Sequence, residues 1–110
     1  MSKRILIIDD DKDMLEILSL LLIESGYEIK AVPGAGNIGN LINHFSPDLI
    51  VMDVMLKGED GRTICKSIKK EPGTRSLPVI LISGMQDFTG SLQSQDLPDD
   101  YLTKPFDLNY

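Results

Sequence analysis

The sequence predicts an α/β protein built on a doubly wound parallel sheet, and two features of its pattern lead to this prediction. Short apolar runs alternate with longer segments of helical periodicity along the 110 residues. The runs at 4–8, 48–52 and 78–82 are almost continuously apolar, as strands are when helices cover both faces of a sheet. No linker or repeat interrupts the alternation, so residues 1–110 are expected to form one domain.

Each predicted element has a local signal. Apolar runs predict five strands, near 4–8, 27–32, 48–52, 78–82 and 100–102. Four helices are expected between them, near 12–25, 35–45, 61–71 and 87–95. Gly26 is a good C-terminal cap for the first helix, and Glu71-Pro72-Gly73 stops the third. The second contains two glycines and has weak intrinsic propensity, and the fourth is poor in core residues.

The composition excludes several classes of function. Seventeen acidic residues against eleven basic ones give a net charge of −6, which argues against sequence-independent binding to nucleic acid, because that needs a basic face. The longest apolar runs, of which Leu20 to Ile23 is one, are far too short to span a membrane, and no signal peptide is evident. We therefore expect a cytoplasmic location. Cys65 is the only cysteine, so it cannot form a disulfide within one chain, and its helical face places it in the core.

Acidic residues follow two of the predicted strands. Asp9-Asp10-Asp11 comes directly after the first strand, and Asp53 comes directly after the third. Carboxylates at the ends of buried strands are costly unless something compensates their charge, so they indicate a site. If the two strands are neighbours, several negative charges lie close together, and Mg²⁺ is the natural compensating cation where phosphate chemistry follows. Asp11 has a simpler interpretation, as the N-cap of the first helix.

Hydrogen-bond donors follow the last two predicted strands. Ser83 comes after the fourth strand and Lys104 after the fifth. Ligands of parallel α/β sheets bind outside the carboxyl ends of the strands, so these donors are expected to join the carboxylates at one rim. A carboxylate can act as nucleophile, while a hydroxyl and an ammonium group can donate to phosphoryl oxygens. The sequence therefore predicts a site for phosphoryl chemistry.

This set of residues resembles a known family. Asp9-Asp10, Asp53, Ser83 and Lys104-Pro105-Phe106, in this order and spacing, are similar to the motifs of the receiver domain of bacterial two-component response regulators, and the resemblance covers essentially the whole chain. It implies a flavodoxin-like fold with strand order 2-1-3-4-5. It also implies a signalling domain that accepts a phosphoryl group from a sensor histidine kinase or histidine phosphotransfer protein and acts on a downstream effector.

The resemblance assigns a role to each matched residue. Asp53 is implied to be the phosphoacceptor, which makes the chain a domain that assists its own phosphorylation and dephosphorylation and not an enzyme acting on other substrates. Mg²⁺ is implied as the cofactor, bound directly by Asp10 and mostly through water by Asp9. The phosphoacceptor and the backbone carbonyl of Met55 complete the ligands that the protein supplies.

Three further positions are implied to respond to phosphorylation. Ser83 is expected to hydrogen-bond the phosphoryl group and Lys104 to pair with it. Tyr101, three residues before the lysine, stands where the family has its switch aromatic.

The chain departs from the family pattern in three places. Lys57 stands where a proline is usual four residues after the phosphoacceptor, and Gly84 replaces the commoner alanine. The sequence ends at Tyr110, before the usual fifth helix, which predicts a truncated receiver with no effector domain. Apolar residues of the first helix, including Leu20 and Ile23, are then expected to be exposed, and either self-association as a homodimer or a following segment is expected to cover them.

Two other functions match part of the sequence. The segment Gly34–Gly39 matches the GxGxxG pattern of dinucleotide-binding modules, but Pro33 interrupts the junction with the strand and the neighbouring acids would repel a pyrophosphate. A Mg²⁺-dependent phosphohydrolase of the haloacid-dehalogenase-like type would need a second acid two residues after the nucleophile, where this chain has Met55. Both alternatives fit the sequence less well than a receiver domain does.

Overall fold

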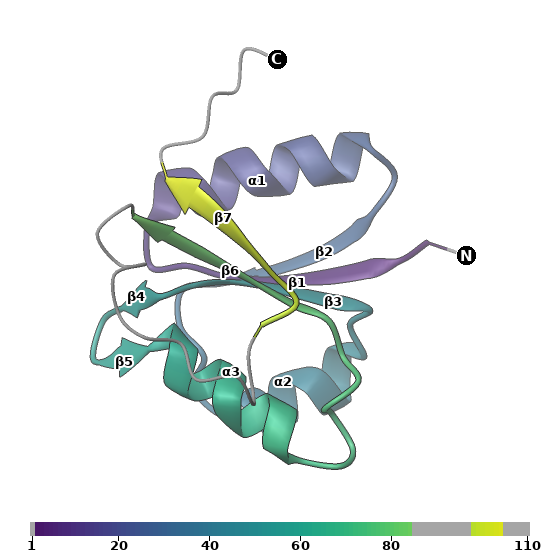
Figure 1. Ribbon diagram of the computed structural model, residues 1–110. Coiled ribbons are helices and arrows are strands. Elements are labelled where there is room, and N and C mark those ends of the chain that lie inside the picture. Colours follow the sequence, from purple (N-terminus) through teal and green to yellow (C-terminus); the bar gives the residue numbers. More distant parts are fainter. Residues whose placement is uncertain (1, 85–97, 105–110) are drawn as a thin grey trace.

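A five-stranded parallel sheet forms the centre of the computed structural model, which describes residues 2–84 and 98–104, with the backbone alone described at 84, 103 and 104. Its strand order is β2-β1-β3-β6-β7 (Figure 1). The strands are β1 (Arg4–Ile8), β2 (Glu28–Val32), β3 (Leu49–Asp53), β6 (Val79–Gly84) and β7 (Asp100–Lys104). The predicted fold class and strand order are confirmed, because this order is 2-1-3-4-5 when only the strands of the main sheet are counted.

Helices cover both faces of the sheet. Figure 1 shows α1 on one face, and α2 and α3 on the other. Their bounds are Lys12–Glu24 for α1, Ile38–Phe45 for α2 and Gly61–Lys70 for α3. The fourth helix expected at 87–95 lies outside the described residues. None of the helices in the described part of the chain combines the length and the apolar character that crossing a membrane requires.

Each of the three helices begins with a side chain that accepts hydrogen bonds from its first turn. Asp11 accepts from Asp13 N and Met14 N, as predicted for this N-cap. Asn37 and Asp60 do the same for α2 and α3. The second helix therefore begins at Ile38, directly after its N-cap Asn37, which is three residues later than predicted from the sequence.

Two apolar clusters lie on opposite sides of the sheet, because alternate residues of a strand point to opposite faces. The cluster beneath α2 and α3 is the larger and includes the buried residues Leu6, Ile50, Leu81, Ile64 and Cys65. The cluster beneath α1 has four buried members, Ile5, Ile7, Val51 and Ile82. The expected core position of Cys65 is confirmed.

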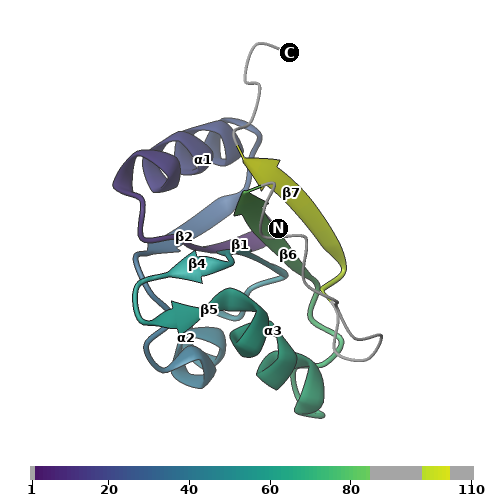
Figure 2. The same ribbon diagram turned by 60° about the vertical axis from the view of Figure 1, so that its left-hand side comes forward.

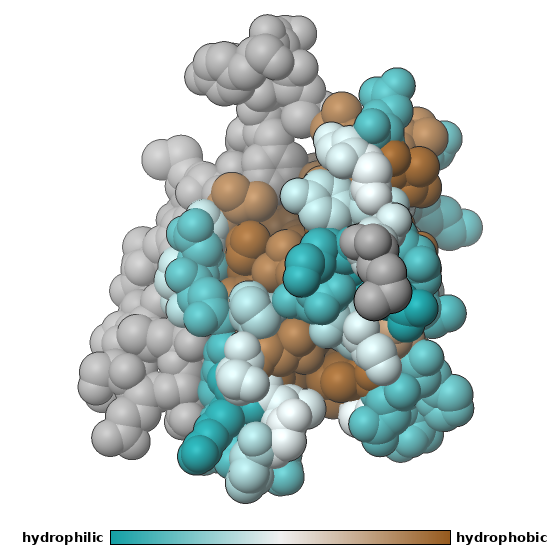
Figure 3. Space-filling view, turned by 90° about the vertical axis from the view of Figure 1, so that its right-hand side faces the viewer, coloured by the Kyte–Doolittle hydropathy of each residue, from teal (hydrophilic) through white to brown (hydrophobic). Residues whose placement is uncertain are grey.

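Helix α1 covers its face of the sheet incompletely. None of its residues is buried, and Leu20 and Ile23 have 60% and 55% of their surface exposed. Figure 3 shows apolar surface, in brown, over the end of α1 at the top of the view. The sequence predicted this exposure of apolar side chains on the first helix.

A short antiparallel hairpin that the sequence did not predict follows the central strand. It consists of β4 (Met55–Leu56) and β5 (Glu59–Asp60), with Gly58 at a φ of 72° between them. A left-handed backbone of this kind favours glycine. Figure 2 shows the hairpin leading directly into α3. The chain therefore doubles back within a few residues of Asp53.

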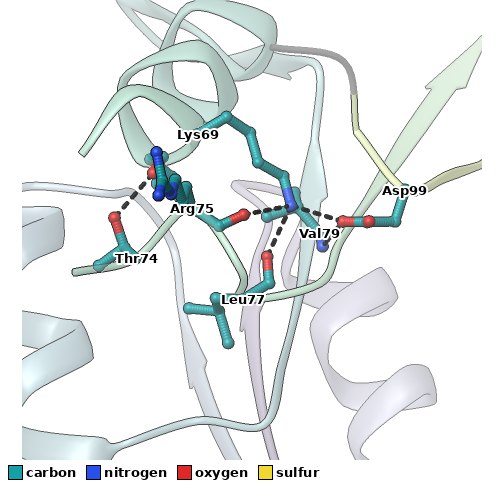
Figure 4. A network of polar contacts seen from close by, with 7 residues as sticks. Lys69, Thr74, Arg75, Leu77, Val79 and Asp99 are labelled. Carbon is teal, nitrogen blue, oxygen red and sulfur yellow. Dashed lines mark hydrogen bonds and ion pairs between the residues drawn. The ribbon is translucent and has the colours of Figure 1, made fainter. Parts of the chain in front are cut away.

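Strand β7 is fastened to α3 by a polar network at the end of the sheet opposite the predicted site (Figure 4). The ammonium group of Lys69 donates to the carbonyl oxygen of Leu77 at 2.8 Å and to Asp99 Oδ2 at 2.7 Å. The same carboxylate oxygen accepts from Val79 N at 2.8 Å, so one aspartate joins the starts of β6 and β7. We call Lys69 and Asp99 the α3–β7 latch.

Candidate phosphoacceptor and metal site

Three carboxylates meet at the carboxyl ends of neighbouring strands. Asp9 follows β1 and Asp53 ends β3, and these strands pair directly, with Ile8 beside Met52. One carboxylate oxygen from each of Asp9, Asp10 and Asp53 lies within 4.8 Å of the other two. Asp9 and Asp53 are buried, and Asp10 is half-buried. The sequence-based placement of these three acids at one rim agrees with the structure.

Backbone hydrogen bonds orient two of these carboxylates in the same way. Asp9 Oδ1 accepts from Asp11 N at 2.9 Å, and Asp53 Oδ1 accepts from Met55 N at 3.1 Å. In each case the donor lies two residues further along the chain, as in an Asx turn. Both side chains are therefore fixed by the loop that follows them, and any movement of that loop moves the carboxylate.

The arrangement is suited to a divalent cation. Three acidic groups at such short separations repel one another, and burial of two of them removes the water that would weaken the repulsion. All the donor atoms are oxygens, which hard cations such as Mg²⁺ prefer. The residues present therefore fit a magnesium ion, which the carboxylates of Asp9, Asp10 and Asp53 would hold.

The strand on the other side of Asp53 brings Ser83 to the same rim. Asp53 lies beside Ile82 in the sheet, so Ser83 is the next residue of β6, and it is buried. Val54 N also donates to Ile82 O at 2.9 Å, which ties the residue after Asp53 to this strand. A hydroxyl group on the strand next to the carboxylates is well placed for an anion bound there.

The end of β7 reaches this rim as well. Lys104 pairs with Gly84 through the backbone, one step beyond the pairing of Ser83 with Thr103. The predicted strand 100–102 is thus two residues longer in the structure. The side chain of Lys104 lies outside the described residues, so its predicted contact with the phosphoryl group stays a prediction.

Tyr101 does not lie at the rim but packs against the cluster beneath α3. Burial raises the pKa of its phenol above the usual value, the nearby Cys65 thiol raises it further, and Arg62 lowers it. These two neighbours show that the ring faces the first turns of α3. The switching role that the family resemblance implies for Tyr101 stays a prediction, and the structure shows the residue packed against the core.

Sequence reasoning missed the part played by the start of α3. Asp60 accepts hydrogen bonds from Arg62 N at 2.8 Å and from the Arg62 guanidinium at 3.1 and 2.9 Å. The side-chain hydrogen bond from Arg62 holds the pKa of Asp60 below its usual value, although burial acts in the other direction. Asp60 was the available signal, since an aspartate directly before a predicted helix is a candidate N-cap.

Comparison with known proteins agrees with this geometry. The family model of the response regulator receiver domain matches residues 5–110. The chain belongs to this family. It is 36% identical over 106 residues to the DNA-binding dual master transcriptional regulator RpaA of Synechocystis, an alignment that covers 96% of this chain and 44% of that protein. The chain thus spans less than half the length of this curated relative.

Solved structures show the same fold. The signal receiver domain of a signal transduction histidine kinase from Syntrophus aciditrophicus has a TM-score of 0.84 and 32% identity, covering 96% of this chain and 81% of that one. The response regulator protein TrrA from Thermotoga maritima, solved in complex with Mg²⁺ and BeF, has a TM-score of 0.82 and 27% identity, covering 97% and 90%. This chain is a receiver domain, the phosphoacceptor module of two-component signalling, and its family implies a histidine kinase or phosphotransfer partner.

Neither alternative function gains support from the structure or the comparisons. The Gly34–Gly39 segment leads into α2 beside the edge strand β2, on the border of an open cavity of about 530 Å³. Met55 stands in the position where a phosphohydrolase would need an acid, and 61% of its surface is exposed. Both the glycine motif and the acidic cluster are therefore explained within one receiver fold.

Proposed function

We propose that Asp53 accepts a phosphoryl group from a phosphohistidine partner in a Mg²⁺-dependent reaction. The observation that carries this proposal is the group of three carboxylates within 4.8 Å of one another at the carboxyl ends of two adjacent strands. Asp53 ends β3, the middle strand of the sheet, with Asp9 on one side and Ser83 on the other. Of the three carboxylates, Asp53 is the one whose strand pairs both with the strand before Asp9 and with the strand that contains Ser83.

The metal would be held by Asp9, Asp10 and Asp53, together with the backbone carbonyl of Met55. When bound, Mg²⁺ offsets the charge of the carboxylates and of the phosphoryl oxygens. TrrA, which shares the fold, was solved with Mg²⁺ and BeF, and this supports the same chemistry here. The hydrogen bond from Met55 N keeps Asp53 Oδ1 in a fixed direction while the group transfers.

In the transfer, a carboxylate oxygen of Asp53 forms a bond to phosphorus as the bond between phosphorus and the histidine nitrogen breaks. The product is an acyl phosphate, and the imidazole leaves with the electron pair of the broken bond and takes a proton from solvent. The Ser83 hydroxyl and the Lys104 ammonium group donate to the phosphoryl oxygens, which stabilises charge where it develops.

The output is proposed to pass through β6 and β7. A hydrogen bond from Ser83 to the phosphoryl group would draw β6 toward Asp53, and Ser83 pairs with Thr103, two residues beyond Tyr101. Repacking of Tyr101 against α3 would then alter the surface offered to a downstream effector. RpaA is a DNA-binding regulator, but the net charge of −6 argues that any contact of this protein with DNA would need another domain or partner.

Intact-mass analysis tests the proposal. Incubation with acetyl phosphate and Mg²⁺ should add the mass of one phosphoryl group, and chelation of the metal should suppress the addition. Asp53→Asn should abolish it, whereas Asp13→Asn, a change of the same kind at an acid outside the cluster, should leave it intact. Equal labelling of Asp53→Asn would disprove the assignment, and rapid turnover of simple phosphomonoesters would favour the phosphohydrolase.

A further inference from the structure

Gly61 packs directly against the backbone of the proposed phosphoacceptor. It is the first residue of α3 and is buried. A methyl group at this position would overlap the carbonyl oxygen of Asp53, and it would lie 3.0 Å from both the carbonyl carbon of Asp53 and the Cα of Val54. All three atoms belong to the main chain, so a flexible side chain could not move aside to make room.

Space, and not backbone conformation, explains the glycine at this position. The glycines with positive φ in the described part of the chain are Gly26, Gly36 and Gly58, and Gly61 is not one of them. An alanine could therefore adopt the local backbone of Gly61 without strain. What it could not do is fit between the start of α3 and the end of β3.

Hydrogen bonds show that this close approach fixes the loop after Asp53. Gly61 N donates to Val54 O at 2.8 Å, and Val54 N donates to Ile82 O at 2.9 Å. Val54 is thus held from both sides, by α3 and by β6, and it is buried. The next residue, Met55, donates the hydrogen bond that orients the Asp53 carboxylate. A displacement at Gly61 therefore passes to that carboxylate through main-chain groups.

We infer that Gly61 is a positioning residue for phosphorylation. It lets the start of α3 hold the Asp53–Met55 backbone where the carboxylate and the Met55 carbonyl can serve the metal and the phosphoryl group together. This inference rests on the proposed function of Asp53. The addition of one methyl group at 61 should therefore impair metal binding and phosphoryl transfer by more than its effect on folding would explain.

The test compares three variants of the 110-residue chain. Gly61→Ala introduces the overlap, while Gly39→Ala makes the same change near the start of α2, where the nearest atom would be Asn37 Oδ1 at an ordinary 3.5 Å. Ile68→Val removes a buried methyl group from α3 without approaching Asp53, and so controls for lost stability. Each is measured for Mg²⁺ affinity by calorimetry, for phosphorylation at saturating Mg²⁺ by intact mass, and for thermal unfolding.

Gly61→Ala should bind Mg²⁺ about 10- to 100-fold more weakly, as when an outer partner of a metal ligand is lost. Its phosphorylation should be about 100-fold slower even at saturating Mg²⁺, the scale for a displacement of about 1 Å near a reacting group. Gly39→Ala and Ile68→Val should match the unmodified chain in both. If Gly61→Ala also stays within twofold of Ile68→Val in both, the inference is wrong.

Two measurements keep the test decisive. If Gly61→Ala is partly unfolded, it is measured in trimethylamine N-oxide, which favours folded states; a chain that stays unfolded there shows a purely structural role and overturns the inference. The backbone amide NMR shifts of Val54 and Met55 report the displacement without any phosphorylation. If the unmodified chain is not phosphorylated, the proposed function of Asp53 is wrong. Altered shifts in Gly61→Ala would then still establish that Gly61 positions the backbone after Asp53.

Discussion

Replacement of Lys69 by methionine should destabilise the domain, because Lys69 is the centre of the α3–β7 latch. Methionine keeps the apolar part of the side chain and removes the ammonium group. Only 11% of the lysine side chain is exposed, and its nitrogen donates to Leu77 O, to Asp99 Oδ2 and, at a longer 3.4 Å, to Arg75 O. The substitution would leave the Leu77 and Arg75 carbonyls and the Asp99 carboxylate without this donor.

The size of the effect follows from these contacts. A hydrogen bond to a charged group contributes about 1.5–3 kcal/mol, and breaking a fully buried ion pair costs about 3–5 kcal/mol. The Asp99 side chain is 51% exposed, so water can replace part of what it loses. We therefore expect the free energy of unfolding to fall by about 2 kcal/mol. For a chain of 110 residues, this corresponds to a decrease in Tm of about 8 °C.

The pH dependence gives a second measure of the same latch. Burial alone would raise the pKa of Asp99, but hydrogen bonds from Lys69 and Val79 N and the charge of Lys69 outweigh it and lower the pKa below its usual value. A carboxyl group with a lowered folded-state pKa stabilises the protein above its unfolded pKa, and this contribution is lost as the pH falls through the folded value. The difference between the parent and Lys69→Met should therefore be complete near neutral pH and shrink below about pH 4.

Urea and thermal unfolding measure the change, with Lys66→Met as the control. Lys66 is an exposed lysine of the same helix, one turn earlier, and its replacement should alter the free energy of unfolding by less than about 0.5 kcal/mol. If Lys69→Met fell within the same limit, the latch would be no stronger than an ordinary surface ion pair. A loss that stayed constant down to about pH 3 would show that packing, and not the ion pair, had been removed.

Two more predictions concern the rim. Without metal, Asp10→Asn should raise the free energy of unfolding by about 1 kcal/mol, because it removes a charge from a group of three within 4.8 Å. The variant should also lose the stabilisation that millimolar Mg²⁺ gives the parent. Thermal unfolding with Mg²⁺ or with a chelator measures both effects, and a variant less stable than the parent in chelator would contradict the repulsion. Lys104→Ala should bind Mg²⁺ as tightly or more tightly, since a positive charge is lost, yet be phosphorylated more slowly. A large loss of Mg²⁺ affinity with an unchanged phosphorylation rate would show that Lys104 serves the metal.

The strands and the acidic cluster could be predicted from the sequence because each depends on local pattern. A short apolar run in alternation with helical segments is typical of a strand buried on both faces, and the run at 4–8 has the same bounds as β1. Parallel strands then place whatever follows them at one rim, which is why Asp9 and Asp53 could be grouped without coordinates. The neighbour relation of β1 and β3 came from the family resemblance, because apolar runs do not specify strand order.

Features that depend on the approach of distant segments could not be predicted. Helix α2 forms although Gly39 weakens its propensity, because Asn37 caps it and Leu41 and Phe45 pack against the core. The latch joins Lys69 to Asp99 across 30 residues of sequence, and neither residue carries a local signal for the other. The contact of Gly61 with Asp53 likewise depends on how the start of α3 packs against the end of β3.

Together, these contacts indicate how a charge added at Asp53 would reach α3. One connection runs through the main chain, from Asp53 through Val54 to Gly61, the first residue of the helix. A second runs across the sheet, from Ile82 and Ser83 to β7, whose Tyr101 faces Cys65 and Arg62 of the same helix. Phosphorylation would replace the single negative charge of the Asp53 carboxylate with up to two on the phosphoryl group, and would add hydrogen-bond acceptors at the point where both connections begin. Since the latch holds the far end of α3 to β7, movement should be greatest in its first turns, at the Tyr101 ring.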